Sequence, residues 1–424
     1  MQFPLESFNA VSAANPWTYV LFGLVGFAFG FTLEMSGFGN SAKLAAQFYF
    51  KELTVLKVMF TAIVTAMVLL FGAVALGVLD FSQVWVNPTY ISSGIVGGLI
   101  MGVGFIVGGF CPTTSLASAS TGKIDGMMFM LGGFVGAFLF GETEQYFTQW
   151  YNNAGYLGRL TLDQVFGLPV GVVVLLIVLM ALFMFWGSEQ LERIIGKKDM
   201  SHEPKLRLVG AGALVAVALA VVFIGQPSLD SRYAKVTFTR TINEEQVVYS
   251  ADEMLANRLV FVSPAEAFKA QYNQSMNPIY LDVRPEADYN LYHIENAVNV
   301  PLAHISEVIP TLLSEPAANS VFILISNDET AAVEAWKVLV ASSVPNVYVL
   351  EGGVNNWIAF FGGDDPEMQP NPTAGDDQLK YLFSSALGSR YESCSPSPIE
   401  YEKLTYDARI VLQLKRDKSG GGCG

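Results

Sequence analysis

The chain has 424 residues, of which 52% are hydrophobic and only 15% are charged, and its formal net charge is −14. This charged fraction is low for a soluble protein. Most acidic residues lie between Asp230 and Gly424, whereas ionisable side chains are few between Trp17 and Leu139. The acidic half argues against nucleic acid as a partner, while the apolar half remains free to handle a small anion.

Six stretches in the first half approach the roughly 20 apolar residues that crossing a hydrocarbon core requires. They are residues 17–35, 55–79, 90–107, 127–140, 167–186 and 208–224. The fourth is long enough only if it begins near Ile124. A single stretch would fit a buried core helix, but six in succession predict a polytopic α-helical membrane domain over residues 1–226. Residues 1–16 contain no Lys or Arg, so no cleavable signal peptide is expected.

Basic residues fall on one side of these predicted crossings. They are Lys43, Lys51, Lys57, Lys123, Arg193, Lys197, Lys198, Lys205 and Arg207, and Arg159 is the exception on the other side. The positive-inside rule places the basic side in the cytoplasm. With six crossings, both termini and the soluble half face outward, which is the periplasm if the host is a Gram-negative bacterium. The expected location is therefore the bacterial inner membrane.

An internal repeat runs through the first four crossings, over about residues 20–80 and 92–141. A shift of 72 residues superposes Gly26 on Gly98, Gly30 on Gly102, Gly37-Phe38 on Gly109-Phe110, Leu44 on Leu116 and Lys51 on Lys123. Glycine-rich helices share some glycines by chance, but the matched Gly-Phe pair and the matched Lys favour a duplication. Two further helices, at residues 164–188 and 207–226, complete the predicted domain.

Each copy contains a polar break, at residues 35–41 and 108–115. Broken backbone at membrane depth is tolerated where it lines a cavity, and matched breaks in two repeats point to a transporter's binding site. Helix N-termini at the breaks would suit a small anion. An even number of crossings per copy predicts parallel rather than inverted copies. The candidate path residues are Glu34, Met35, Ser36, Asn40, Gly109, Phe110, Cys111, Pro112 and Thr113.

Two of these candidates have an alternative interpretation. Cys111 is either a functional thiol at the break or a small packing residue. Glu34 is either functional, because a carboxylate within a crossing costs roughly 2.5–3.5 kcal/mol at a helix centre, or it pairs with Lys43 or lies near the cytoplasmic surface.

The segments 30–44 and 102–116 resemble the signature segments of the YeeE/YedE family of inner-membrane sulfur-compound transporters. The second, with Gly-Gly-Phe-Cys-Pro-Thr-Thr-Ser at 108–115, is the more specific. The resemblance covers about residues 20–140, as two half-sized members joined in one chain. It implies uptake of thiosulfate or a related sulfur species along a cysteine-lined path, with Cys111 as a path cysteine. Gly39 replaces the cysteine of the first copy, which weakens the case for a relay between cysteines.

Beyond Gly225 the pattern changes to strands alternating with helices. Residues 236–241 and 244–250 predict a hairpin of their own. The continuous apolar runs that follow predict a parallel sheet covered on both faces. The segments 281–285, 293–301 and 347–357 resemble, in order and spacing, a rhodanese domain. An α/β rhodanese-like domain is therefore expected over residues 227–375, followed by an extension over 376–424.

The resemblance implies a persulfide-bearing cysteine at the end of the strand before the long helix, and Ser326 stands at that position. A hydroxyl cannot carry a persulfide, and the carboxylates of Asp328 and Glu329 would repel thiosulfate. The domain is expected to be catalytically inactive, with a role in binding a partner or positioning the tail.

The extension ends in Gly-Gly-Gly-Cys-Gly, with Cys423 next to last. This end resembles that of the thiosulfate-carrier protein of the Sox sulfur-oxidation system. It implies that Cys423 carries sulfur on a glycine arm. Two alternatives stay open: a disulfide between Cys394 and Cys423 in an oxidising compartment, and a disordered tail without function.

The leading hypothesis is a membrane transporter for thiosulfate or a related small sulfur anion. The partners expected are that anion, the lipid bilayer and a periplasmic sulfur-carrier protein. A membrane-anchored sulfur carrier without transport is the alternative, and a sulfurtransferase enzyme is favoured least. No metal cluster, nucleotide-binding loop or redox motif is visible, so no cofactor is expected.

Overall fold

A computed structural model describes residues 16–79, 81, 84, 86–197, 206–242, 245–315, 319–363 and 365–412. The chain divides into two compact units, and each is described by itself. One is helical and contains Val86–Gln226 with the helices that precede them, and the other is the α/β unit Pro227–Lys418. Cys423 lies outside the described residues.

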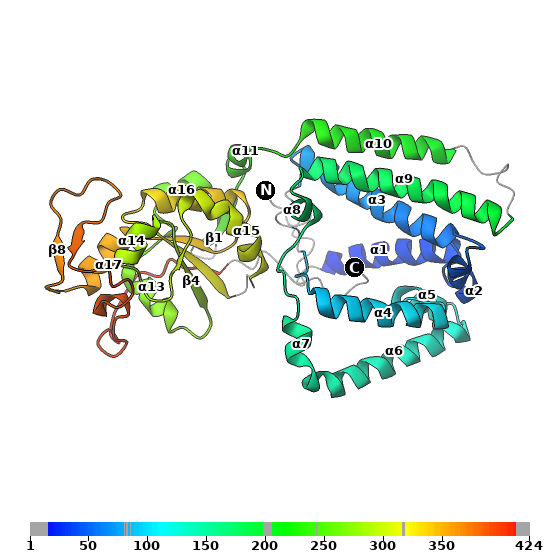
Figure 1. The fold of residues 1–424 in the computed structure, drawn as a ribbon, viewed down its shortest axis with the longest axis horizontal. Coiled ribbons are helices and arrows are strands. Elements are labelled where there is room, and N and C mark those ends of the chain that lie inside the picture. The colour runs from blue at the N-terminus through cyan, green and yellow to red at the C-terminus, as the bar shows by residue number, and fades with distance from the viewer. Residues whose placement is uncertain are drawn as a thin grey trace. The chain divides into compact units, whose positions relative to one another are not determined.

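The helical unit repeats one order of elements, a long helix, a short helix and a second long helix. The first copy consists of α1 (Pro16–Met35), α2 (Ser41–Ala45), η1 (Ala46–Tyr49) and α3 (Thr54–Ala75). The second consists of α4 (Ile91–Gly108), α5 (Pro112–Ser120) and α6 (Ile124–Thr143). In Figure 1, α1 and α4 run in the same direction and α3 and α6 return, so the two copies are parallel.

The remaining helices of this unit include two more long ones. They are η3 (Glu144–Tyr146), α7 (Thr148–Asn153), α8 (Leu162–Phe166), α9 (Val170–Ile194) and α10 (Leu206–Ile224). Helices α3, α9 and α10 pack through small and β-branched side chains, among them Val64, Val178 and Ala218. Other apolar side chains of the long helices, such as Phe27 and Val107, are exposed, as residues that face lipid would be.

Five helical stretches of the described residues are long and apolar enough to cross a membrane. They are Thr54–Ala75, Ile91–Ser120, Ile124–Tyr146, Val170–Ile194 and Arg207–Ile224. The sixth predicted crossing lies on α1, whose apolar part Tyr19–Met35 is shorter than the length required for the other five. Helix α6 begins at Ile124 and so reaches the necessary length. The predicted polytopic helical domain is confirmed.

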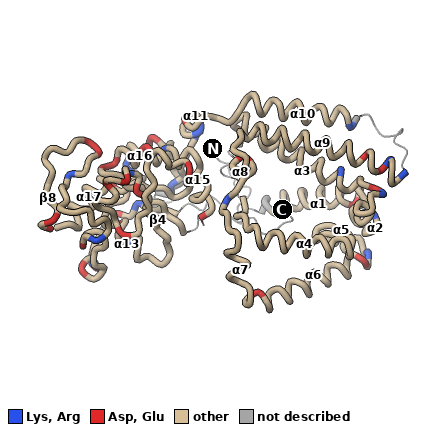
Figure 2. Tube along the Cα trace, viewed as in Figure 1, with Lys and Arg blue, Asp and Glu red and all other residues tan. Residues whose placement is uncertain are grey.

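Basic side chains gather at one end of the helical unit (Figure 2). This is the end where α2 contains Lys43, α6 is preceded by Lys123, and α9 finishes with Arg193 in its last turn. The chain enters α10 at this end, near Arg207, and leaves it at the opposite end, at Ile224. The segregation of charge seen in the sequence is therefore also a segregation in space.

The α/β unit opens with α11 (Leu229–Tyr233) and an antiparallel hairpin, β1 (Thr237–Ile242) with β2 (Glu245–Ser250). Its central sheet has five parallel strands in the order β3-β7-β6-β4-β5. These strands are β3 (Phe261–Val262), β4 (Asn277–Asp282), β5 (Val298–Asn299), β6 (Ser320–Ile325) and β7 (Val347–Leu350). Every residue of β6 is buried, as expected of a central strand covered on both faces.

Helices cover both faces of this sheet. One face packs on α12 (Ala251–Ala256), α15 (Ile305–Ser314) and α16 (Thr330–Ala341), and the other on α13 (Pro264–Gln271) and α17 (Gly353–Phe361). The other elements are α14 (Glu286–Leu291), η4 (Leu302–His304), β8 (Met368–Pro370), β9 (Tyr381–Phe383) and η5 (Glu392–Cys394). The α/β fold with a parallel sheet, predicted from the apolar runs, is confirmed.

The described part of the extension, residues 376–412, belongs to the α/β unit and packs on its sheet and on α13. The buried carboxylate of Glu266 accepts hydrogen bonds from the backbone N–H groups of Arg409 and Ile410, each at 2.8 Å. The hydroxyl of Tyr348 donates to the carbonyl oxygen of Val411 at 3.0 Å and accepts from its N–H at 2.9 Å. The chain is therefore held to the sheet as far as Val411.

Candidate functional site

Both polar breaks contain a glycine in the left-handed backbone conformation at the same place. Gly37 and Gly109, which the 72-residue shift superposes, have left-handed φ values of 74° and 70°. Such values favour glycine because it has no Cβ, and they end α1 and α4 in the same way. The phenylalanines that follow, Phe38 and Phe110, are both buried in one apolar cluster with Leu44. Matched glycines therefore turn the chain, and matched phenylalanines pack the two copies together.

The two breaks also contact each other directly. Oγ of Ser118 in α5 donates a hydrogen bond to the carbonyl oxygen of Gly39 at 3.1 Å. A Cβ built on Gly109 would lie 3.0 Å from both Cβ and the carbonyl oxygen of Ser41. Oγ of Ser41 in turn lies 3.5 Å from a carboxylate oxygen of Asp125 in the first turn of α6. The duplicated segments thus form one polar junction between the copies.

Cys111 occupies the N-cap of α5 at this junction. Its backbone N–H donates to Oγ1 of Thr114 at 3.0 Å, and its Sγ lies 3.3 Å from the same oxygen. Pro112 and Thr113 form the first turn of α5, where a proline is favoured because no intrahelical N–H is needed. The thiol is partly exposed. It therefore lies at the positive end of a helix dipole, beside the junction.

Glu34 finds a partner in the other copy. Its Oε1 lies 3.3 Å from Nζ of Lys123. Lys43, the neighbour in sequence, instead donates from Nζ to the carbonyl oxygen of Ser36 at 2.9 Å. A Cβ built on Gly39 would lie 2.8 Å from Oε2 of Glu34 and 2.8 Å from Nζ of Lys123. The pair therefore occupies the space into which a side chain at position 39 would extend.

The other predicted path residues lie at the margin of the junction. Met35 ends α1 and is 74% exposed. The side chain of Asn40 caps α2 by accepting the backbone N–H groups of Ala42 and Lys43, at 3.0 and 3.4 Å. Met35 is thus exposed and Asn40 is a helix cap, whereas Gly109 lies against Ser41 and Phe110 packs with Phe38 of the first break.

The loop that follows β6 in the α/β unit begins with Ser326, as the sequence predicts. Ser326 is fully buried, and its Oγ has no hydrogen-bond partner among the described residues. Its carbonyl oxygen accepts the N–H of Val354 at 2.9 Å. The hydroxyl is therefore buried at the start of the loop rather than presented to solvent.

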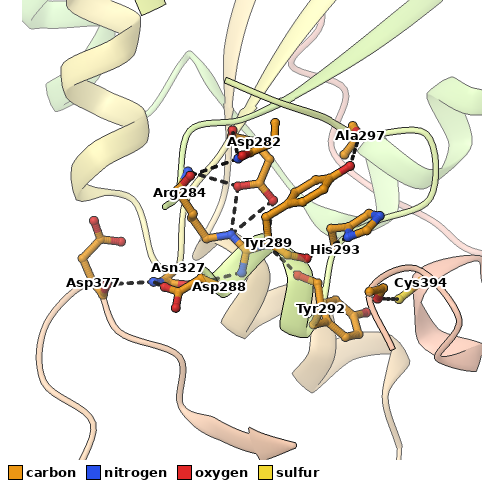
Figure 3. A network of polar contacts seen from close by, with 12 residues as sticks. Asp282, Arg284, Asp288, Tyr289, Tyr292, His293, Ala297, Asn327, Asp377 and Cys394 are labelled. Atoms are coloured by element: carbon orange, nitrogen blue, oxygen red, sulfur yellow. Dashed lines mark hydrogen bonds and ion pairs between the residues drawn. The ribbon is translucent and has the colours of Figure 1, made fainter. Parts of the chain in front are cut away.

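A buried ion pair between Arg284 and Asp282 contacts this loop through Asn327 (Figure 3). Nη2 of Arg284 lies 2.6 Å from Oδ2 of Asp282, and the two side chains are 1% and 0% exposed. Arg284 also donates to Oδ1 of Asn327 at 3.2 Å and to the carbonyl oxygen of Tyr292 at 2.7 Å. Asn327 donates in turn to Oδ2 of Asp288 at 2.8 Å. The guanidinium therefore links β4 to the loop, with all of its charge compensated inside the domain.

Cys394 lies in the apolar cluster on the face of the sheet that α13 and α17 cover. Its thiol donates to the carbonyl oxygen of Gly388 at 3.4 Å and is 1% exposed. Burial raises the pKa of this thiol to about 11. It is a packed core residue in the described structure, and to pair with Cys423 it would have to leave that core.

Most of the helical unit and the first elements of the α/β unit match a known protein family. A family model described as sulphur transport matches residues 35–257, slightly more than half of the chain. The chain belongs to the sulphur transport family. A second model, described as a rhodanese-like domain, matches residues 264–360. This family member is thus a multi-pass, sulfur-related membrane transporter joined to a rhodanese-like domain.

Similarity to individual proteins is slight. No curated protein sequence matches this transporter. The crystal structure of a protein from Lactobacillus plantarum matches 26% of the chain and 91% of its own, with 22% identity and a TM-score of 0.22.

Several residues of the transporter's junction escaped the sequence analysis as site residues. They are Ser41, Ser118, Lys123 and Asp125. For Lys123 a signal existed, because the repeat superposes it on Lys51. For Ser118 there was none, because the shift places it on Ala46, and a serine in a short amphipathic stretch is ordinary.

Proposed function

We propose that this transporter carries thiosulfate or a related small sulfur anion across the bacterial inner membrane, past the junction of the two polar breaks. The observation that supports this best is the hydrogen bond from Ser118 of α5 to Gly39 of the first break, on the helix that begins with the thiol of Cys111 at its N-cap. Polar backbone at matched breaks is the arrangement in which repeat-built transporters bind their cargo.

The chemistry of the junction suits such an anion. The N-terminus of α5 offers a positive dipole end, and the cations of Lys43 and Lys123 lie at the same end of the unit. A thiol is polarizable and a weak donor, so Cys111 would contact the outer sulfur of thiosulfate without a covalent step.

The orientation follows from the loop charges. The basic end of the helical unit is proposed to face the cytoplasm. Helix α10 leaves from the opposite end, so the rhodanese-like domain is proposed to lie in the periplasm. There it would meet a sulfur-carrier protein, and Cys423 of the tail would hold sulfur in transit. The domain itself is proposed to be catalytically inactive, because Ser326 has no thiol to carry a persulfide.

Uptake of labelled thiosulfate by cells without another thiosulfate importer tests the proposal. Cys111→Ala should lower uptake about tenfold or more, since each lost contact of about 1.4 kcal/mol corresponds to a factor of ten. Cys394→Ala, which removes a thiol from the core of the other unit, is the matched control and should leave uptake per molecule of protein unchanged. Competition with sulfite, selenite and sulfate would define the cargo.

Three results would contradict parts of this proposal. Undiminished uptake by Cys111→Ala would exclude a role for that thiol. Absence of uptake by the wild type, with a sulfur adduct on Cys423, would favour a carrier without transport. Thiocyanate formation from thiosulfate and cyanide by the purified protein would show that the rhodanese-like domain is active.

A further inference from the structure

Four consecutive backbone N–H groups, those of residues 328–331 at the end of the β6–α16 loop and the start of α16, donate to carboxylate oxygens. Asp328 and Ala331 donate to Oδ1 and Oδ2 of Asp377, at 3.1 and 3.2 Å. Glu329 and Thr330 donate to Oδ1 of Asp328, the latter at 2.8 Å. Successive N–H groups at a helix N-terminus form a site for anions. Here two carboxylates of the chain itself occupy that site.

Asp377 belongs to a segment, residues 375–380, that lies across the loop and is called the strap below. Asp377 has a left-handed φ of 51°, and its N–H donates to Oδ2 of Asp328 at 2.8 Å. Its carbonyl oxygen accepts from Asn327 at 2.9 Å (Figure 3). The side chain of Asn355 in α17 holds the rest of the strap, by bonds to Gln378 and Lys380 at 2.9 and 2.8 Å. The strap is therefore held at Asp377 itself and at the residues that follow it.

The buried hydroxyl of Ser326 is a second, independent sign of an anion site. Ser326 directly follows β6, and strand alternation continued by one residue turns its side chain to the face of Phe322 and Leu324, which belong to the same buried cluster as Ala332 of α16. Its Oγ is fully buried and has no hydrogen-bond partner among the described residues. A buried polar atom without a partner requires an explanation, and a displaced ligand is one.

We propose that Asp377 is a built-in ligand: its carboxylate fills the anion site of the loop, and the strap keeps that site closed to free anions. This inference does not depend on transport. It gives Asp377 of the extension a function of its own. A serine at position 326 would by itself leave the domain without a persulfide carrier, with no need for a strap over the loop.

The charges around Asp377 agree with this arrangement. Asp328 faces it from the loop, Asp288 approaches from α14 through Asn327, and Glu329 at the start of α16 is neutralised by Arg258. Burial raises the pKa of Asp377, and the carboxylate of Asp328 adds to this. For Asp328, burial is outweighed by three backbone N–H donors, which lower its pKa to about 2. Acidification would therefore protonate Asp377 first.

Chemical rescue followed by hydrogen exchange tests the proposal on the purified full-length protein. Asp377→Gly removes the carboxylate and suits the left-handed φ. Amide exchange in peptides covering residues 326–335 should become several-fold faster than in the wild type. Potassium formate should restore the protection, whereas potassium chloride of equal ionic strength should not. Asp376→Gly, which removes the neighbouring exposed carboxylate, is the matched control and should exchange like the wild type.

The outcomes show whether the carboxylate of Asp377 fills an anion site or whether the strap only stabilises the loop by packing. Unchanged exchange in Asp377→Gly, or equal protection by chloride and formate, would overturn the proposal, as would protection of the wild-type loop by formate. If exchange in Asp377→Gly rises throughout β6, the α/β unit of that variant has unfolded. The Asp377→Asn variant then tests the proposal in its place. The amide of Asp377→Asn would still occupy the site but has only one oxygen to accept the two N–H groups, so exchange should rise without rescue by formate, and rescue would contradict the assignment. Thiosulfate uptake is a separate measurement, so failure here leaves the transport proposal intact.

Discussion

Oγ of Ser118 donates a hydrogen bond to the carbonyl oxygen of Gly39, 79 residues earlier in the chain. Ser118 is fully buried, and the bond crosses from the second copy of the repeat to the first. It satisfies a backbone carbonyl at a break, where no helix can do so. One side chain of α5 therefore contributes a buried hydrogen bond to the junction of the two copies.

Ser118→Ala should weaken that junction. A buried carbonyl left without its donor costs about 1–3 kcal/mol. The thermal unfolding temperature of the detergent-solubilised protein should fall, and thiosulfate uptake should fall with it. Ser120→Ala is the matched control, because the Ser120 hydroxyl is exposed and bonds to Ala117 within its own helix. Equal behaviour of the two variants would argue against the junction.

Gly39→Ala should separate Glu34 from Lys123 without unfolding the protein. The new Cβ would meet only the flexible ends of these two side chains at 2.8 Å, so they can move aside. The pair is exposed, and such pairs contribute at most about 1 kcal/mol. We expect altered uptake at nearly unchanged unfolding temperature. Gly132→Ala, at a position with open space, should alter neither; a large loss of stability in Gly39→Ala would contradict the geometry.

Arg284→Ala should destabilise the rhodanese-like domain strongly. It leaves the fully buried carboxylate of Asp282 without its partner, which costs about 3–5 kcal/mol. Hydrogen exchange of β6 amides would measure the loss locally. Lys337→Ala provides the contrast, because Lys337 forms an exposed pair with Glu334 at 2.8 Å and should cost less than about 1 kcal/mol. A similar effect of both variants would mean that the buried pair is not structural.

The thiol of Cys394 should be unreactive in the folded protein. Its pKa of about 11 exceeds the ordinary thiol value, so the thiolate at neutral pH is about a hundredfold scarcer than for a free cysteine. Because the folded pKa is raised, the associated stability is fully present below the unfolded pKa and is lost as the pH rises through about 11. Maleimide labelling at pH 7 should modify Cys394 only after denaturation, and rapid labelling of the native protein would refute its burial.

Elements with long, regular patterns were predictable from the sequence. The apolar runs predicted the helices, the 72-residue repeat predicted parallel copies, and the continuous apolar runs of the second half, residues 320–326 among them, predicted a parallel sheet. These patterns are strong because each depends on many residues of the same kind.

Partnerships between single side chains were not predictable in the same way. Nearness in sequence suggested Lys43 for Glu34, but Lys43 reaches the carbonyl oxygen of Ser36, and the partner of Glu34 lies 89 residues away. Asp377 also meets the loop after Ser326 from far along the chain, since 49 residues separate it from Asp328. Such pairs are brought together by packing of whole elements, which no local pattern encodes.

The hydrogen bonds that Glu266 accepts from Arg409 and Ile410 affect when the α/β unit can complete its folding and which fragments of it can be prepared. They join positions 143 and 144 residues apart, so α13 gains these partners only after nearly the whole chain has been synthesised. Any excised fragment must therefore extend to at least Val411. A shorter one would leave the buried carboxylate of Glu266 without donors, raise its pKa further and expose apolar surface to aggregation.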